Sequence, residues 1–243
     1  MKKLLLLALL GLTSLHAGVI TLPTHLGPTD FDTSAFPNTL VGGSLSGTSL
    51  QFGVGVPIAS GPFTLAQAIP LVTGSDITKG LALGAGPTGG VADFIVPGFG
   101  NISIINGPGA DLVIFEAGSP AEEFLLAVSL DGGVTFSSNV PYSTFAAVPA
   151  NSASGFITNT AFVDLTDFGI GAGDKVDAIM LSGLFTGIGG SGPDILAIGV
   201  LNFGTPTGNV PGDGTSIPEP STFALMFGGL AAVVWARRKR SAA

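Results

Sequence analysis

Carboxylate side chains are the residues of this chain whose types and spacing favour binding chemistry. Two aspartates, Asp111 and Asp194, lie beside apolar runs that are typical of strands. Four more surround a glycine-rich loop at 169–173: Asp164, Asp167, Asp174 and Asp177. Hard cations take oxygen ligands from carboxylates and backbone carbonyls. The set therefore predicts a structural Ca²⁺ site, with a solvated acidic loop as the alternative.

Three glutamates, Glu116, Glu122 and Glu123, raise a second hypothesis. Glycosidases place two carboxyl groups on either side of the bond that they cleave. Their clefts also use aromatic platforms, whereas residues 18–217 contain one tyrosine, Tyr142, and no tryptophan. We therefore expect the glutamates to lie at a solvated strand edge or turn, and we expect no enzymatic activity.

Other catalytic groups are scarce. The chain has no cysteine and two histidines, His16 and His25. A Ser-His-Asp triad needs an imidazole held between the nucleophile and the carboxylate, and a closed zinc site needs several His or Cys ligands. His25 lies in a segment that looks irregular, so we expect it to be a solvated bystander.

The far end of the chain has the pattern of a membrane segment. Residues 222–236 carry no charge and would span roughly 22 Å as a helix, somewhat short for a bilayer core of about 30 Å. Pro218 and Pro220 precede the run and mark a helix start. Four cations follow it and indicate a cytoplasmic end: Arg237, Arg238, Lys239 and Arg240. The pattern predicts a transmembrane helix over 222–236.

Pro218-Glu219-Pro220, the apolar helix and the basic cluster together resemble the PEP-CTERM sorting signal of Gram-negative bacteria. The resemblance covers 217–243. It implies processing by an exosortase near the Pro-Glu-Pro and transient anchoring in the inner membrane. It also implies delivery to the cell surface or extracellular matrix, with association with exopolysaccharide or biofilm.

The front of the chain has the pattern of a secretory signal peptide over 1–17. Lys2 and Lys3 form a charged start, residues 4–12 are mostly apolar, and Ala17 is a suitable last residue before cleavage. Between 18 and 217 only Lys79 and Lys175 oppose fifteen acidic residues, which gives a net charge of −13. Such a surface repels nucleic acid and anionic lipid.

The remaining residues predict an all-β fold, an antiparallel, jelly-roll-like β-sandwich flanked by the signal helix and the transmembrane helix. Short apolar runs alternate with turn residues, as the 38 glycines and 17 prolines indicate. We expect an irregular segment at 18–48, a sandwich domain at 49–204 and a flexible linker at 205–216. Strands are predicted at 49–56, 91–96, 101–105, 110–116, 124–130, 133–137, 155–164, 175–182 and 194–203. Asp131-Gly132 predicts a tight hairpin turn between two of them.

Four blocks of the domain are similar to a group of exported bacterial jelly-roll domains that resemble carbohydrate-binding and discoidin-like sandwiches. The blocks are 107–116, 128–132, 164–169 and 194–198. The chain departs from that pattern at Pro193 and Leu196, where Phe and Asp are usual. If that Asp is a ligand in the similar domains, this chain lacks the site.

The sequence thus predicts an exported, non-catalytic surface or matrix protein, structural or associated with exopolysaccharide. Two alternatives stay open: an extracellular glycan hydrolase that uses carboxylates, and an adhesin that self-associates through exposed sheet edges.

Overall fold

The computed structural model shows a fold built of antiparallel strands. It describes residues 18–45, 50–53, 59–84, 92–100, 102–118, 121–143, 145–153, 156–184 and 192–204. All of them belong to the first of the two units into which the chain divides, Met1–Val210 and Pro211–Ala243. The predicted signal peptide, linker and sorting segment lie outside the described residues.

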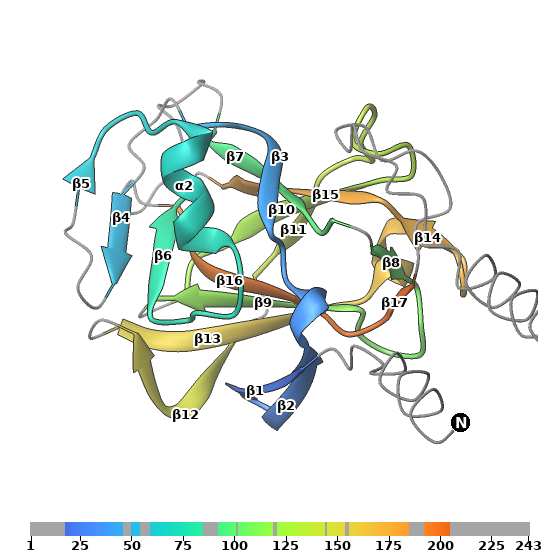
Figure 1. Cartoon of the computed structure of the whole chain (residues 1–243), viewed down its shortest axis with the longest axis horizontal. Helices are drawn as coiled ribbons and strands as arrows, with labels where there is room; N and C mark the ends of the chain where they lie inside the picture. Colours follow the sequence, from blue (N-terminus) through green and yellow to red (C-terminus); the bar gives the residue numbers. More distant parts are fainter. Residues whose placement is uncertain are drawn as a thin grey trace, which may run out of the picture. The chain divides into compact units, whose positions relative to one another are not determined.

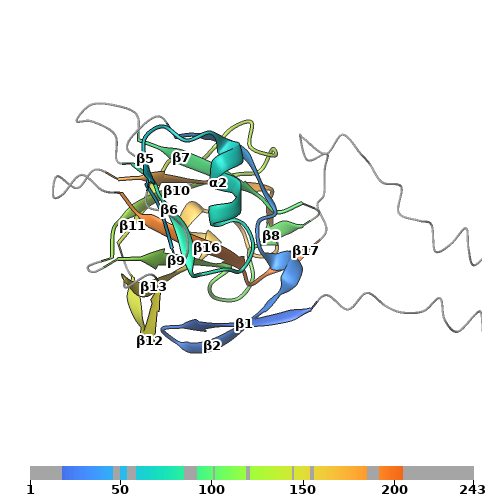
Figure 2. The same ribbon diagram turned by 60° about the vertical axis from the view of Figure 1, so that its left-hand side comes forward.

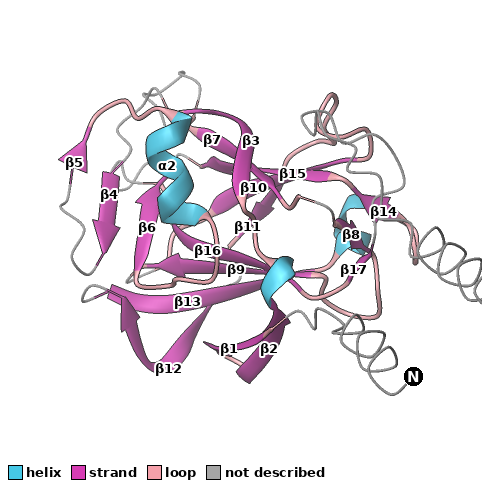
Figure 3. Ribbon diagram, viewed as in Figure 1, coloured by secondary structure: helices cyan, strands magenta, loops and turns pink. Residues whose placement is uncertain are grey.

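Two large sheets form the body of the fold (Figures 1 and 3). The five-stranded sheet has the order β11 (Val140–Tyr142), β10 (Phe124–Ser129), β15 (Ala178–Gly183), β7 (Phe94–Gly98) and β3 (Thr39–Ser44). The seven-stranded sheet has the order β12 (Ala146–Ala153), β13 (Phe156–Val163), β9 (Leu112–Ala117), β16 (Asp194–Val200), β6 (Lys79–Ala82), β4 (Leu50–Gly53) and β5 (Ala59–Ser60). The pairs within both sheets are antiparallel.

The main core lies between these two sheets, as the predicted sandwich requires. Leu112 and Ile114 of β9 share one buried cluster with Phe124 and Leu126 of β10. Alternate side chains of β9 point to the other face of the sheet, where Val113 and Phe115 join a second cluster. β9 is therefore buried on both faces, which explains its nearly continuous apolar sequence. The finer jelly-roll assignment stays a prediction.

The segment predicted to be irregular, 18–48, is ordered in its described part, so that prediction is wrong. β1 (Val19–Thr24) and β2 (Gly27–Asp32) form a hairpin that covers the outer face of the seven-stranded sheet (Figure 2). Leu22 and Phe31 supply its buried contacts. Thr, Pro and Asp occupy many intervening positions and conceal the alternation of inward and outward side chains. The 3-10 turn η1 (Thr33–Ala35) follows, and β3 then enters the five-stranded sheet.

The hairpin fits against the sheet because β16 has a glycine at the contact. A Cβ atom at Gly199 would overlap the ring of Phe31. We expect Gly199→Ala to lower the free energy of unfolding by about 1–3 kcal/mol, because an added methyl in a packed contact forces its neighbours apart. Urea denaturation measures the loss. Gly42→Ala provides a matched control outside the hairpin, since a Cβ atom there would make only ordinary contact with Val96. Faster proteolysis of the hairpin in Gly199→Ala alone is expected; equal cleavage of both variants would contradict this account.

A short helix and a small third sheet complete the described part. α2 (Leu65–Val72), which the sequence patterns did not predict, is capped by reciprocal bonds between Thr64 and Gln67 and packs on β6, β3 and β16. β8 (Ser103–Ile105) pairs with both β14 (Lys175–Val176) and β17 (Phe203–Gly204). The 3-10 turn η2 (Leu165–Phe168) leads into the loop before β14.

The predicted hairpin after β10 is only partly present. No strand forms at 133–137; β10 pairs instead with β11 and β15. The chain still turns at Gly132, where φ is 73°, and the Ser137 amide donates to the Val128 carbonyl at 2.8 Å. Side-chain bonds around Asp131 replace the strand ladder that the tight turn was expected to start. The other predicted strand ranges each overlap an observed strand.

Candidate functional site

The structure does not bring the six predicted calcium ligands together. Among the described residues, no group of three or more carboxylate or imidazole side chains is arranged to hold a metal ion. Asp111 directly precedes β9, Asp164 lies between β13 and η2, and Asp167 lies within η2. Asp174 and Asp177 flank β14, and Asp194 starts β16. Four of the six accept hydrogen bonds from protein donors: Asp111, Asp164, Asp167 and Asp177.

Asp111 holds several backbone segments together through hydrogen bonds. Its side chain is completely buried. Oδ1 accepts from the Gly107 amide at 2.7 Å and from Asn202 Nδ2 at 2.9 Å. Oδ2 accepts from the Leu165 amide at 2.9 Å. The carboxylate therefore joins three segments that are distant in sequence, and protein donors occupy the oxygens that a cation would need.

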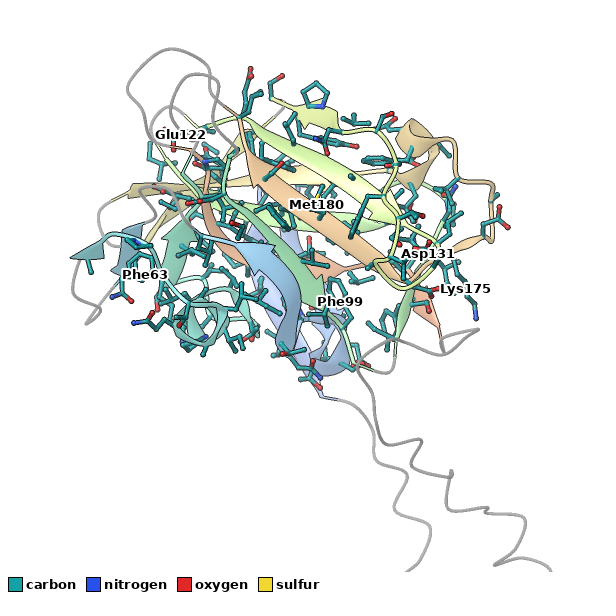
Figure 4. All side chains as sticks on the ribbon, turned by 90° about the horizontal axis from the view of Figure 1, so that it is seen from above. Phe63, Phe99, Glu122, Asp131, Lys175 and Met180 are labelled. Carbon is teal, nitrogen blue, oxygen red and sulfur yellow. The ribbon has the colours of Figure 1, made fainter. Side chains whose placement is uncertain are left out.

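A carboxylate cluster lies at the opposite end of β10 from Asp131 (Figure 4). It consists of Glu116, Glu122 and Asp194. Glu116 faces the core and is completely buried; it accepts from Asn159 Nδ2 at 2.9 Å and from the Glu122 amide at 3.3 Å. Burial outweighs these bonds and raises the pKa of Glu116 to about 7. Burial and the neighbouring charges of Glu122 and Glu116 raise the pKa of Asp194 to about 8.

The raised pKa values of Glu116 and Asp194 resemble those of a catalytic acid–base pair. Their cluster differs from such a pair because a substrate cannot reach Glu116. A catalytic carboxyl group must come within hydrogen-bond reach of the substrate atom that it protonates or deprotonates. Glu116 has no exposed surface and is engaged by Asn159 and the Glu122 backbone. The expectation that the glutamates lie at a solvated edge is therefore wrong for Glu116, whose burial instead accounts for its raised pKa.

His25 is likewise docked rather than solvated. Its Nδ1 lies 2.7 Å from Thr160 Oγ1, and its ring packs edge-on against Phe162 with centroids 5.1 Å apart. The turn between β1 and β2 is thereby fastened to β13. The residue that was expected to be a bystander thus helps to hold the outer hairpin in place.

An open depression lies at the end of the sandwich where β10 finishes. Its volume is about 530 Å³, which falls within the range of small-molecule sites. Leu130 and Ile170 give it apolar walls, and Asp174, Lys175 and Asp177 give it charged ones. Figure 4 shows Asp131 and Lys175 at this end of the molecule. Two of the predicted aspartates, Asp174 and Asp177, therefore do share a site, with a lysine between them.

Hydrogen bonds fix one wall of this depression. The Ser129 hydroxyl donates to Asp131 Oδ1 at 2.6 Å and accepts from the Gly133 amide at 2.8 Å. Asp131 also accepts from the backbone and side chain of Thr135. These bonds lower the pKa of Asp131 to about 2. These bonds hold the turn that carries Leu130, a residue that is 59% exposed.

Asn106 fixes the opposite wall from behind. This residue is almost completely buried, and its Nδ2 donates to the Ile170 carbonyl at 2.7 Å. Its backbone exchanges bonds with Gly173 and Asp174 at 2.8 and 2.9 Å. Ser103 Oγ donates to Asp177 Oδ1 at 2.8 Å. Sequence patterns indicated the aspartates and the glycine-rich loop, but they gave no signal for Asn106 or Leu130.

Comparison with known proteins identifies the far end of the chain. Residues 216–240 match the PEP-CTERM protein-sorting motif. The chain matches no curated protein and no solved structure. In the described residues no helix has the length and hydropathy needed to cross a bilayer, while the predicted membrane segment 222–236 lies outside them. The motif confirms the resemblance of the Pro-Glu-Pro segment, and the chain therefore carries the sorting signal of exported proteins that an exosortase processes.

Proposed function

We propose that this chain is a non-catalytic protein of the cell surface or extracellular matrix, structural or associated with exopolysaccharide. The observation that carries the proposal is the sorting motif at 216–240. The motif supports export and a membrane-associated sorting signal. To this we add two proposals: the cell surface or matrix as the final location, and exopolysaccharide as the partner.

The folded part of the chain is consistent with such a role. Residues 18–217 contain fifteen acids and two lysines, a balance that favours solubility outside the cell and disfavours binding to nucleic acid. The carboxylate cluster around Glu116 is the observation that favours the alternative, a glycan hydrolase. Its burial supports a structural role instead.

The location is tested in the native cell. The matrix, the washed cells and the medium are separated, and the intact mass of the protein is measured in each fraction. We expect a matrix or surface form that lacks residues 1–17 and 222–243. In a matched variant, alanines replace Pro218, Glu219 and Pro220; we expect it to stay with the inner membrane at a mass that includes the tail.

Either of two results would overturn the proposal. One is a wild-type protein that is free in the medium and is not retained by the matrix. The other is a matrix form that still contains residues 222–243, which would contradict processing near the Pro-Glu-Pro.

A further inference from the structure

We infer that the depression bounded by Leu130, Ile170, Asp174, Lys175 and Asp177 binds an uncharged sugar ring. The inference rests on the proposed association with exopolysaccharide and names the site and the class of ligand that it takes. This depression is called the sugar subsite below.

The apolar walls of the subsite suit one face of a pyranose. Leu130 is 59% exposed, and Ile170 is partly buried against the core. Both side chains line the same depression. A ring that places its C–H face on them removes apolar surface from water, which is favourable.

The polar walls suit the hydroxyl groups at the rim of the same ring. Carboxylates only accept hydrogen bonds, an ammonium group only donates them, and hydroxyls do both. Asp174 and Asp177 lie on either side of Lys175 in sequence and line the depression with it. Adjacent sugar hydroxyls can therefore donate to a carboxylate and accept from the ammonium group at once.

The walls are held before any ligand arrives. Asn106 fixes the backbone of the 170–174 loop. After Leu130, the Asp131 and Gly133 amides donate to Ser129 Oγ. Before it, the Ser129 carbonyl accepts from the Asp177 amide. Ordering loops and side chains on binding costs free energy, so a site whose walls are already hydrogen-bonded retains more of its interaction energy as affinity.

The charges of the subsite set its selectivity. Two carboxylates and one ammonium group give the lining a net charge of −1. A uronic acid would bring a further carboxylate against Asp174 and Asp177, and like charges in contact are costly. The subsite should therefore discriminate against acidic sugars.

Saturation-transfer NMR on the exported protein tests the inference, because it detects weak ligands. The probes are the methyl glycosides of glucose, galactose and mannose, with methyl glucuronide as the acidic counterpart. We expect transfer to at least one neutral probe and about tenfold weaker binding of the glucuronide. Asp174→Asn and Leu130→Ser should each weaken the neutral probe by about tenfold, the effect of losing one charge-assisted bond or one apolar wall. Both side chains are exposed, so neither change should unfold the protein.

Asp30→Asn is the matched control, since it removes an equal charge from the exposed face of the outer hairpin. It should bind as the wild type does. No transfer to any neutral probe, equal binding of the glucuronide, or unchanged binding in both subsite variants would each overturn the inference. If these failures occur while the wild type is still retained by the matrix, the proposed function stands and only the subsite is wrong.

Discussion

Replacing Asp111 by asparagine is expected to lower the free energy of unfolding by about 3–5 kcal/mol. The carboxylate is completely buried and accepts from Gly107, Leu165 and Asn202. An amide turns one of the two oxygens into a donor that faces other donors. At least one bond to a charged group is then lost and a buried N–H is left unpaired.

Urea denaturation of the exported protein measures this effect. Asp164→Asn is the control, because Asp164 caps η2 at a partly exposed site. Asparagine caps a helix about as well as aspartate does, so this change should have little effect on the free energy of unfolding. If Asp111→Asn prevents folding, Asn202→Ala removes one of the same bonds and should cost about 1.5–3 kcal/mol.

The same measurement separates the structural role of Asp111 from the predicted calcium site. We expect the wild-type midpoint to be equal in EDTA and in excess Ca²⁺, because protein donors occupy both oxygens of Asp111. A midpoint that falls in EDTA, together with an Asp111 variant that is destabilised only when Ca²⁺ is present, would show that the carboxylate binds a cation.

The sequence predicted the central strands because their burial leaves a plain apolar pattern. Three strands are buried on one or both faces: β9, β10 and β16. Their sequences are therefore continuous or alternating runs of apolar residues. The hairpin of β1 and β2 was missed because its outer face carries Thr, Pro and Asp, and because few of its side chains are buried. β5, β11 and β14 are too short for any periodicity to show.

The candidate sites were predicted by residue type but not by arrangement. Carboxylates in loops suggested a cation site, yet the carboxylate of Asp164 accepts from the backbone of its own turn. Asp111 was predicted as a cation ligand, and in the fold its carboxylate accepts from three protein donors. A carboxylate that satisfies buried amides and one that binds a metal look alike in sequence, since only the fold determines which donors surround them.

Glu116 governs the second large effect that we expect, which depends on pH. Its pKa lies at about 7 in the folded protein against an ordinary value of 4.5. Between these two pH values the unfolded chain loses its proton while the folded protein keeps it. Stability therefore falls as pH rises through this window, and Glu116 alone accounts for about 3 kcal/mol of the fall. Asp194 adds to it in the same direction, with a folded pKa of about 8.

Glu116→Gln should remove the part of this dependence that Glu116 contributes, while the part due to Asp194 remains. Glutamine is uncharged at every pH, so raising the pH does not place a charge at this buried position. It also relieves Asp194 of a neighbouring negative charge, which contributes to the raised pKa of that residue. At pH 5 the variant should be less stable than the wild type, because its amide cannot accept all the bonds that Asn159 and the Glu122 backbone donate.

Urea denaturation at pH 5 and at pH 9 shows whether the two stability curves cross. The fall in unfolding free energy between these values should be smaller by about 3 kcal/mol in Glu116→Gln than in the wild type. Glu123→Gln removes a carboxylate from the neighbouring loop and should leave the fall unchanged. If Glu116→Gln shows the full wild-type fall, Glu116 is ionised throughout the range, and the bonds from Asn159 and the Glu122 amide outweigh the effect of its burial. The carboxylate cluster would then stabilise the end of the sandwich as an ordinary charged network.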